Sequence, residues 1–208
     1  SAAVIYKGQV HVFYGMQLPT GVTLRHAWLD AGTWRFENLD GPGAAAGNGR
    51  TANNVGSFLS ATATPAGIVV AYADDVESRL RVAQFAAATG WQMSDVDGPG
   101  VPFADAVAQS IDYELAATVI GDVVHLIYNN EDEDTLRHAW LSGGLWRRET
   151  VDGAGGSNGL VATDVGEWAG VAVYNGQLHA FYEGLSLAGT GLRHAWLDNG
   201  TWKAETLD

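Results

Sequence analysis

The sequence predicts an all-β fold built from one unit that occurs four times. Four matching segments begin at Leu24, Leu80, Leu136 and Leu192, so the repeat is 56 residues long. Within each repeat, short runs rich in β-branched and aromatic residues alternate with Gly-containing turns, which is typical of β-hairpins. No 3.6-residue helical period extends over a useful length.

Each repeat divides into four short strands. In the last repeat the runs are 168–174, 177–182, 192–198 and 201–207, and Asn175-Gly176 and Asn199-Gly200 form two of the turns between them. Four antiparallel strands that recur every ~40–60 residues are typical of the blades of a β-propeller. A single blade cannot bury both of its apolar faces, so the blades are expected to pack around a common axis.

The expected fold class is therefore a β-propeller of four four-stranded blades, either complete or part of a larger propeller. The chain is expected to form one domain, 1–208, with blades at about 1–40, 57–97, 113–152 and 168–208. A closed four-bladed ring and an excerpt from a longer propeller both fit, and the closed ring is the first choice. Six repeated tryptophans are expected to fill the wedges between neighbouring sheets: Trp28, Trp34, Trp140, Trp146, Trp196 and Trp202.

Composition excludes several classes of function. The net charge of −13 would repel nucleic acid and anionic membrane surfaces. The absence of cysteine excludes disulfides, thiol catalysis and Cys-ligated zinc. No apolar run is long enough to cross a membrane. The chain begins at Ser1 without a methionine, as expected of a processed or excised piece.

The long connections between repeats point to one functional end of the propeller. The two- or three-residue turns within each repeat leave little chain for binding, whereas residues 41–56, 98–112 and 153–167 form long crossovers. Aromatic residues follow each crossover, with carboxylates beside them, a combination suited to stacking and hydrogen bonding of sugars. The alternative is that these aromatics only cap a central tunnel. The candidate ligand-binding residues are Phe58, Tyr113, Trp168, Asp112, Glu114, Asp164 and Glu167.

Two of the remaining loops are acidic and are candidate calcium sites. Calcium prefers six to eight oxygen ligands, and dense carboxylates could supply them. The spacing differs from that of an EF-hand loop, and the alternative is a solvated loop. The candidate residues are Asp74, Asp75, Glu131, Asp132 and Asp134.

The histidines suggest repeated pairs rather than one catalytic centre. Counting back from the turn between the third and fourth strands places a histidine opposite a glutamate in three repeats. In the second repeat both partners are absent, with Val82 and Ser94 in their places. We expect structural His–Glu pairs that raise the histidine pKa. Threefold repetition argues against a catalytic dyad, and no catalytic residue is assigned. The pairs are His26–Glu37, His138–Glu149 and His194–Glu205.

Two further positions are invariant among the four repeats. An arginine follows each repeat-defining leucine and is interpreted as a scaffold ion pair: Arg25, Arg81, Arg137 and Arg193. An aspartate ends each fourth strand and is interpreted as a turn former: Asp40, Asp97, Asp152 and Asp208.

Taken together, these motifs resemble the bacterial surface and secreted β-propeller repeats of sialidase-like and lectin-like proteins. The resemblance covers essentially the whole chain, and in the last repeat it rests on 165–168, 176–182, 192–195 and 200–208. It implies a propeller located outside the cell or at its surface. It does not imply one activity, because the fold carries many functions.

Three functions remain open. The first choice is a carbohydrate-binding, lectin-like module whose partner is a glycan or another neutral ligand, with no cofactor except possible calcium; an oligomer is possible. The first alternative is a propeller-type glycoside hydrolase or lyase that uses Asp105, Asp164 or Glu167. The second is a protein-interaction scaffold with an apolar patch at Val101, Phe103, Leu160 and Val161.

Overall fold

A computed structural model describes residues 1–103, 105–107, 111–153, 164–186 and 189–208. The chain forms four antiparallel sheets, and the strands of each sheet pair in chain order. The first sheet contains β1 (Ala2–Tyr6), β2 (Gln9–Leu18), β3 (Gly21–Asp30) and β4 (Thr33–Asp40). The second contains β5 (Val55–Thr64), β6 (Gly67–Asp74), β7 (Arg79–Ala86) and β8 (Gly90–Asp97). The third contains β9 (Asp112–Ile120), β10 (Val123–Asn130), β11 (Thr135–Ser142) and β12 (Leu145–Asp152). The fourth contains β13 (Val165–Tyr174), β14 (Gln177–Ser186), β15 (Gly189–Asp198) and β16 (Thr201–Thr206).

The hairpin turns follow from local residue chemistry. Asn199 and Gly200 have φ values of 50° and 79°, and the corresponding turn at Asn175 and Gly176 has 50° and 76°. Two successive positive φ values define the turn that matches the twist of antiparallel strands, and Asn-Gly adopts it readily. These turns fix the register of each hairpin, so that Asp198 pairs with Thr201.

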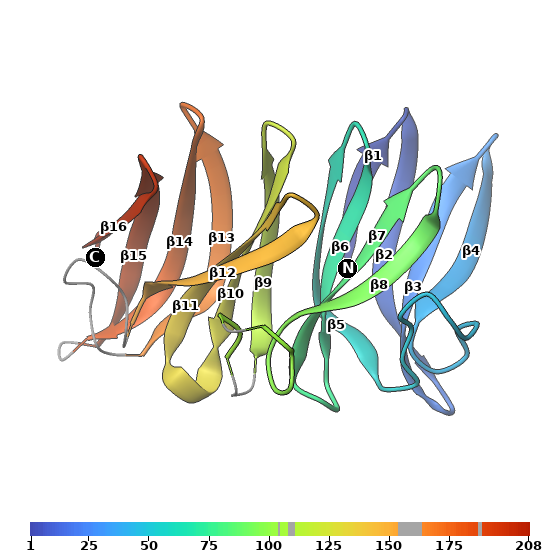
Figure 1. Cartoon of the computed structure of the whole chain (residues 1–208), viewed down its shortest axis with the longest axis horizontal. Helices are drawn as coiled ribbons and strands as arrows, with labels where there is room; N and C mark the ends of the chain where they lie inside the picture. Colours follow the sequence, from blue (N-terminus) through green and yellow to red (C-terminus); the bar gives the residue numbers. More distant parts are fainter. Residues whose placement is uncertain (104, 108–110, 154–163, 187–188) are drawn as a thin grey trace.

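Each sheet is one blade of a β-propeller, and the blades pack in sequence. The first strands of successive blades contact one another, β1 with β5, β5 with β9 and β9 with β13. Figure 1 shows the four blades in a row, with blade 1 (β1–β4) at the right and blade 4 (β13–β16) at the left. The first and last blades are separated by the other two, so this arrangement is open, unlike the closed ring that the sequence favoured.

The core lies between the blades. Three clusters of buried apolar side chains occupy the three spaces between successive sheets. We call the face of a blade that is turned toward the next blade its forward face, and the opposite one its backward face. Trp146 and Trp202 fill the wedge from the backward faces of blades 3 and 4, and Trp91 does so in blade 2.

Of the six repeated tryptophans predicted to fill wedges, Trp146 and Trp202 do so fully, and the other four do so in part or not at all. Trp34 is exposed because no blade covers the backward face of blade 1. Trp28, Trp140 and Trp196 are only partly buried, and each stacks on the histidine two residues before it in the chain.

The two ends of the blades differ in character. In each blade, the turns between the first and second strands and between the third and fourth strands lie along the upper edge of the row in Figure 1, whereas connection 41–54 and the described residues of connection 98–111 run along the lower edge. The lower edge, called here the lower rim, is therefore the end where loops are long enough to form a site. Among the described residues, no helix is sufficiently long and apolar to cross a membrane.

Candidate functional site

A buried aspartate joins each blade to the next. Asp40, at the end of β4, accepts hydrogen bonds at Oδ2 from the Tyr72 hydroxyl (2.7 Å) and from Arg81 Nε (3.2 Å), both on blade 2. Its other oxygen accepts the backbone N–H groups of Gly41 and Thr51. The sequence assigned the aspartate to a turn and the arginine to an ion pair, but it did not reveal that they join neighbouring blades.

The same anchor recurs at the other two interfaces. Asp97 accepts from Tyr128 (2.6 Å) and Arg137 Nε (3.0 Å), and Asp152 accepts from Tyr182 (2.5 Å) and Arg193 Nε (2.8 Å). All three carboxylates are completely buried. Burial, followed by the aspartate charge, raises the pKa of Tyr128 well above its usual range, so this hydroxyl stays protonated and donates. The anchor is a scaffold element at all three interfaces between successive blades.

The His–Glu pairs are part of longer hydrogen-bonded chains. His26 Nδ1 lies 2.8 Å from Glu37 Oε1, His11 Nδ1 lies 2.9 Å from His26 Nε2, and Trp91 of blade 2 donates to Glu37 at 3.0 Å. A carboxylate only accepts, so His26 Nδ1 must carry a proton. When His26 is neutral, its Nε2 accepts from His11 Nδ1, and His11 Nε2 remains without a proton.

Blade 3 contains the same chain, and blade 4 contains most of it. His125, His138 and Glu149 are linked by distances of 2.9 Å each, and Trp202 of blade 4 donates to Glu149 at 2.8 Å. In blade 4 the distance from His194 Nδ1 to Glu205 Oε1 is 3.0 Å. Thus the network spans two interfaces and is present, without its tryptophan donor, on the outer blade.

The expected rise in histidine pKa is wrong for the buried members of this network. Burial lowers the pKa of His138, and this effect outweighs the hydrogen bond and charge of Glu149. Burial and the neighbouring His138 lower the pKa of His125 to about 4. For Glu149, burial alone would raise the pKa, but the hydrogen bonds from His138 and Trp202 lower it overall. These histidines are therefore neutral near pH 7.

A cavity of about 370 Å³ lies beside the network between blades 1 and 2, lined in part by His11, Trp28 and Phe85. The unprotonated His11 Nε2 could act as a general base in this cavity only if the atom faced it. That atom is buried and has no hydrogen-bond partner among the described residues. Together with the recurrence of the network in blade 3, this burial assigns the histidines to the scaffold.

A different candidate site lies at the lower rim of blade 4, around Trp168. Its backbone has a φ of 52°, an unusual conformation for an aromatic residue. The register of β13 against β14 shifts between Glu167 and Gly170, so a β-bulge turns this residue out of the ladder. Glu114 on blade 3 accepts a hydrogen bond from the Trp168 backbone N–H. The indole is held in this way with 73% of the residue's surface exposed.

A small acidic hollow adjoins Trp168 in the chain. Its volume is about 240 Å³, and Asp164, Glu167, Glu183 and Thr190 line it. We call Asp164, Glu167 and Glu183, together with Glu114 and Trp168, the acidic rim site. Four of these five residues, all except Glu183, were predicted from the sequence to bind a ligand. Glu183 was missed because it enters from β14, and its place beside β13 depends on the bulge.

Three carboxyl groups of the acidic rim site, Glu114, Asp164 and Glu167, have pKa values raised above their ordinary values. Burial raises the pKa of Glu114, the Trp168 N–H opposes this, and the charges of Glu167 and Glu183 reinforce it. Burial and then the nearby Asp164 raise the pKa of Glu167. Such a cluster can accept several hydrogen bonds from hydroxyl groups, or supply one proton.

The remaining predicted aromatics do not join Trp168 in one site. Phe58 has a φ of 43° and lies at a bulge of β5, equivalent in position to Trp168. It lines a separate small hollow with Glu114 and Leu115, at the interface of blades 2 and 3. Asp112 and Tyr113 begin β9, and their side chains lie outside the described ones.

The acidic loops are occupied by contacts within the chain. Asp74 is buried and accepts from Asn53 and from the backbone N–H groups of Val76 and Glu77. Asp75 accepts from the Ser57 hydroxyl. Glu131 and Asp132 begin a short 3₁₀ turn that Asp134 closes with a φ of 53°. No group of three or more possible metal ligands occurs in the described part of the chain, so the calcium prediction gains no support.

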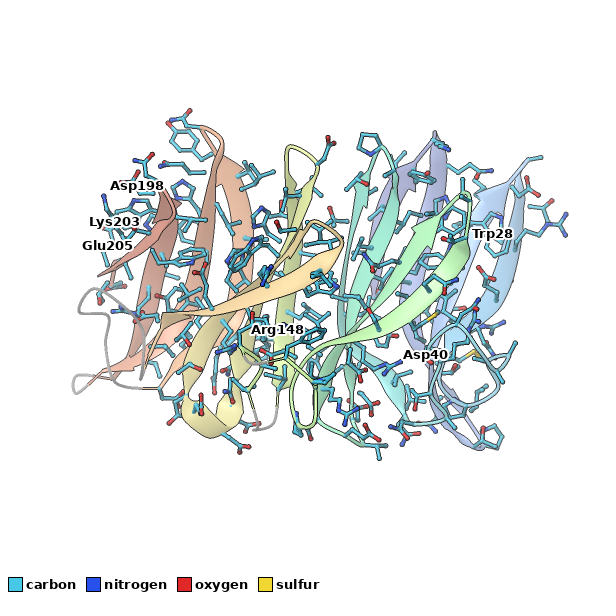
Figure 2. The ribbon with its side chains drawn as sticks, in the orientation of Figure 1. Trp28, Asp40, Arg148, Asp198, Lys203 and Glu205 are labelled. Atoms are coloured by element: carbon cyan, nitrogen blue, oxygen red, sulfur yellow. The ribbon has the colours of Figure 1, made fainter. Side chains whose placement is uncertain are left out.

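Of the residues named for the two alternative functions, Asp164 and Glu167 lie together in the acidic hollow, and the other described ones lie apart from it. Asp105 forms an ion pair with Arg148 at 2.9 Å, and that guanidinium lies over the ring of Phe103. Figure 2 shows Arg148 near the middle of the row. Val101 is buried, which removes it from any exposed patch. Leu160 and Val161 lie outside the described residues.

Comparisons with known proteins support the fold class. No family model matches the chain, and no curated protein sequence matches it. Among solved structures, the chain is similar to the exo-β-1,3-galactanase of Phanerochaete chrysosporium, solved with β-1,3-galactotriose (TM-score 0.57), and to the catalytic domain of a family 62 α-L-arabinofuranosidase from Coprinopsis cinerea (TM-score 0.56). It is also similar to the fucose-specific lectin of Aleuria aurantia (TM-score 0.55).

These similarities concern the fold alone. Sequence identity is 14% in each case. The alignments cover 100%, 98% and 95% of this chain, but only 49%, 66% and 55% of the galactanase, arabinofuranosidase and lectin chains. The chain thus spans between about half and two thirds of these structures, and it is a propeller-like all-β protein.

Proposed function

We propose that this chain is a carbohydrate-binding, lectin-like propeller module that acts outside the cell or at its surface. The observation that carries the proposal is the acidic rim site. It presents the exposed indole of Trp168, fixed by a bulge and a hydrogen bond, and Glu183 lines both the hollow beside this indole and the carboxylate-lined hollow. The apolar face of a sugar ring stacks on such an indole, and its hydroxyl groups donate to the carboxylates.

The structural neighbours support the proposal in outline. They include a fucose-specific lectin and an enzyme solved with a galactotriose, so a propeller of this kind can present a sugar site. The hollow of the acidic rim site is small, about 240 Å³, which fits weak binding at single sites. Several copies on one surface would strengthen such binding through avidity. The net charge of −13 favours neutral over anionic sugars.

The test is titration of the chain with neutral mono- and oligosaccharides, selected from a glycan array, and followed by tryptophan fluorescence or calorimetry. Trp168→Ala should weaken binding about tenfold, equivalent to ~1.4 kcal/mol. Tyr174→Ala is the matched control, since Tyr174 is an exposed aromatic at the other end of β13. Binding should also weaken as the pH falls through the raised pKa of Glu167. An array without signal, or equal affinity in the two variants, would reject the proposal.

A glycoside hydrolase is the second candidate, and one observation favours it. Glu114 and Glu167 are neighbouring carboxyl groups, each with a raised pKa, as a general acid needs. Release of the phenol from a panel of aryl glycosides would reveal this activity. Glu114→Gln and Glu167→Gln should each abolish turnover but retain binding. Turnover that survives both substitutions would place the chemistry elsewhere.

A further inference from the structure

The outer face of blade 4 is the same surface that is buried in blade 1. A shift of 168 residues relates Tyr6, Phe13, Leu24 and Leu39 on the forward face of blade 1 to Tyr174, Phe181, Leu192 and Leu207 on blade 4. Tyr6 is 8% and Leu24 0% exposed, whereas Tyr174 is 66% and Leu192 47% exposed. Blade 4 therefore carries a complete forward face without a blade to cover it. Figure 2 shows Glu205 of this blade at the left end of the row.

The backward face of blade 1 is uncovered in the complementary way. Trp34 is equivalent to Trp91, since each directly follows the turn into the fourth strand of its blade, and they are 45% and 7% exposed. Ile5, Val10 and Phe36 are exposed on the same blade. A chain of net charge −13 that leaves two apolar sheet faces in solvent has surfaces typical of an interface.

The polar groups of these two faces also lack the partners that the formed interfaces supply. Arg25 is equivalent to Arg81, Arg137 and Arg193, whose Nε atoms each donate to the anchoring aspartate of the previous blade. Arg25 Nε is buried and has no hydrogen-bond partner in the described structure. The aspartate equivalent to Asp40, Asp97 and Asp152 is Asp208, which is exposed and borders an open hollow of about 520 Å³ with Phe181 and Leu192.

We propose that the forward face of blade 4 binds the backward face of blade 1 of a second copy of this chain, by the contacts that join successive blades within it. Asp208 of one copy accepts hydrogen bonds from Arg25 Nε and from the Tyr14 hydroxyl of the other, since Tyr14 pairs with Arg25 across β2 and β3 as Tyr72 pairs with Arg81 across β6 and β7. Glu205 accepts the indole N–H of Trp34, as Glu37 accepts from Trp91 and Glu149 from Trp202. The occupant is a second copy because the tyrosine, arginine and tryptophan that such a contact needs recur on every backward face, and among the described blades the backward face of blade 1 is the one left uncovered.

Two such contacts close a ring of two copies. The contact is head-to-tail, and head-to-tail contacts produce rings when the rotation closes. Two four-bladed chains give eight blades, within the range of about four to eight that is usual for propellers. Trp168 and Glu183 also line the hollow beside Asp208, so the contact borders the acidic rim site. Phe58, which occupies the equivalent bulge at a covered interface, keeps 48% of its surface exposed. The contact is argued from the blade faces alone, and its test measures mass without any sugar.

Sedimentation and light scattering of the full chain over a wide range of concentrations test the proposal. The expected mass is twice 22.0 kDa, and it should fall to 22.0 kDa on dilution. Asp208→Arg and Arg25→Asp should each give monomers. Circular dichroism should show native β-structure in both, because neither residue belongs to a formed interface. Asp30→Arg, at an exposed residue of blade 1, is the control and should assemble like the wild type.

Mixing the two monomeric variants provides the decisive step. In a ring of one Arg25→Asp chain and one Asp208→Arg chain, one contact is native and the other has both charges reversed. The mixture should therefore recover the doubled mass, which neither variant forms alone. A wild-type chain that is monomeric at every concentration would overturn the proposal. A dimer that both variants retain, or that mixing fails to restore, would overturn it equally, since the contact would then not be head-to-tail through these residues.

Discussion

The middle interface of the row differs from the two that flank it. All three interfaces contain the buried aspartate with its tyrosine and arginine. The histidine network exists only in the flanking ones. At the middle interface, valines and Ser94 replace it, and the indole N–H of Trp146 is buried without a hydrogen-bond partner among the described residues. The aspartate anchor is thus common to all blade contacts, whereas the polar histidine network can be replaced by apolar packing.

The largest effect is expected from the anchor itself. Arg137→Ala would leave the Asp97 carboxylate buried without its cation, which costs about 3–5 kcal/mol when a buried pair is broken. Urea unfolding followed by tryptophan fluorescence measures this change. Arg35→Ala is the control, because Arg35 pairs with Asp30 on the surface of blade 1 and its side chain is exposed. Its effect should stay within about 0.5 kcal/mol.

Acidification should weaken the flanking interfaces before the middle one. Burial lowers the pKa values of His138 and His125 below 6.5, so the unfolded chain binds more protons than the folded chain between the folded and unfolded values. The stability that neutral histidines contribute is complete above about pH 6.5 and is lost as the pH falls toward 4. The pKa of Glu149 is also lowered in the folded chain, so protonation of this carboxylate removes further stability as the pH falls below the ordinary pKa of a glutamate.

This dependence is tested by measuring the free energy of unfolding between pH 7 and 4. The wild type is compared with a triple variant that has valine in place of His125 and His138 and serine in place of Glu149. The triple variant copies the composition of blade 2, and its stability should change less steeply with pH. Equal slopes would show that these histidines titrate alike in the folded and unfolded chains.

The smallest effect is expected from the indole N–H groups. Trp202→Phe removes the donor to Glu149 and should destabilise the chain by about 1 kcal/mol. Trp146→Phe removes an unsatisfied buried donor from the middle interface and should be close to neutral, or slightly stabilising. Thermal unfolding of both variants gives the comparison. A loss at Trp146 as large as that at Trp202 would indicate that ring volume, rather than the hydrogen bond, decides both results.

The sequence was sufficient to predict which residues pair across neighbouring strands within one blade. Asn-Gly turns with two positive φ values determine which residues face each other, so the opposition of His194 and Glu205 could be counted from the chain. Contacts between blades could not be counted in this way. Asp97 and Arg137 are 40 residues apart and were assigned separate roles, although their joint recurrence in every repeat was a signal that they could meet.

The site shows the same division. Trp168 and Glu167 were found from their place after a crossover, where β13 begins. Glu183 was missed, because a bulge shifts the pairing of β13 with β14 and the sequence gives no count of residues across a bulge. Closure of the ring depends on the angle between successive blades, which no local pattern encodes.

The central claim is that one contact, repeated between blades, determines both the fold and the free faces at its ends. It is tested most directly by the free energies of unfolding of Asp40→Ala, Asp97→Ala, Asp152→Ala and Asp208→Ala, measured in dilute, dissociated protein. Asp97→Ala and Asp152→Ala should lose about 3–5 kcal/mol, because each leaves a buried arginine without its anion. Asp40→Ala should lose less, because Arg81 keeps its ion pair with Asp95. Asp208→Ala should lie within about 0.5 kcal/mol of the wild type. Four equal losses would contradict the account, since Asp208 would then already be anchored within its own chain.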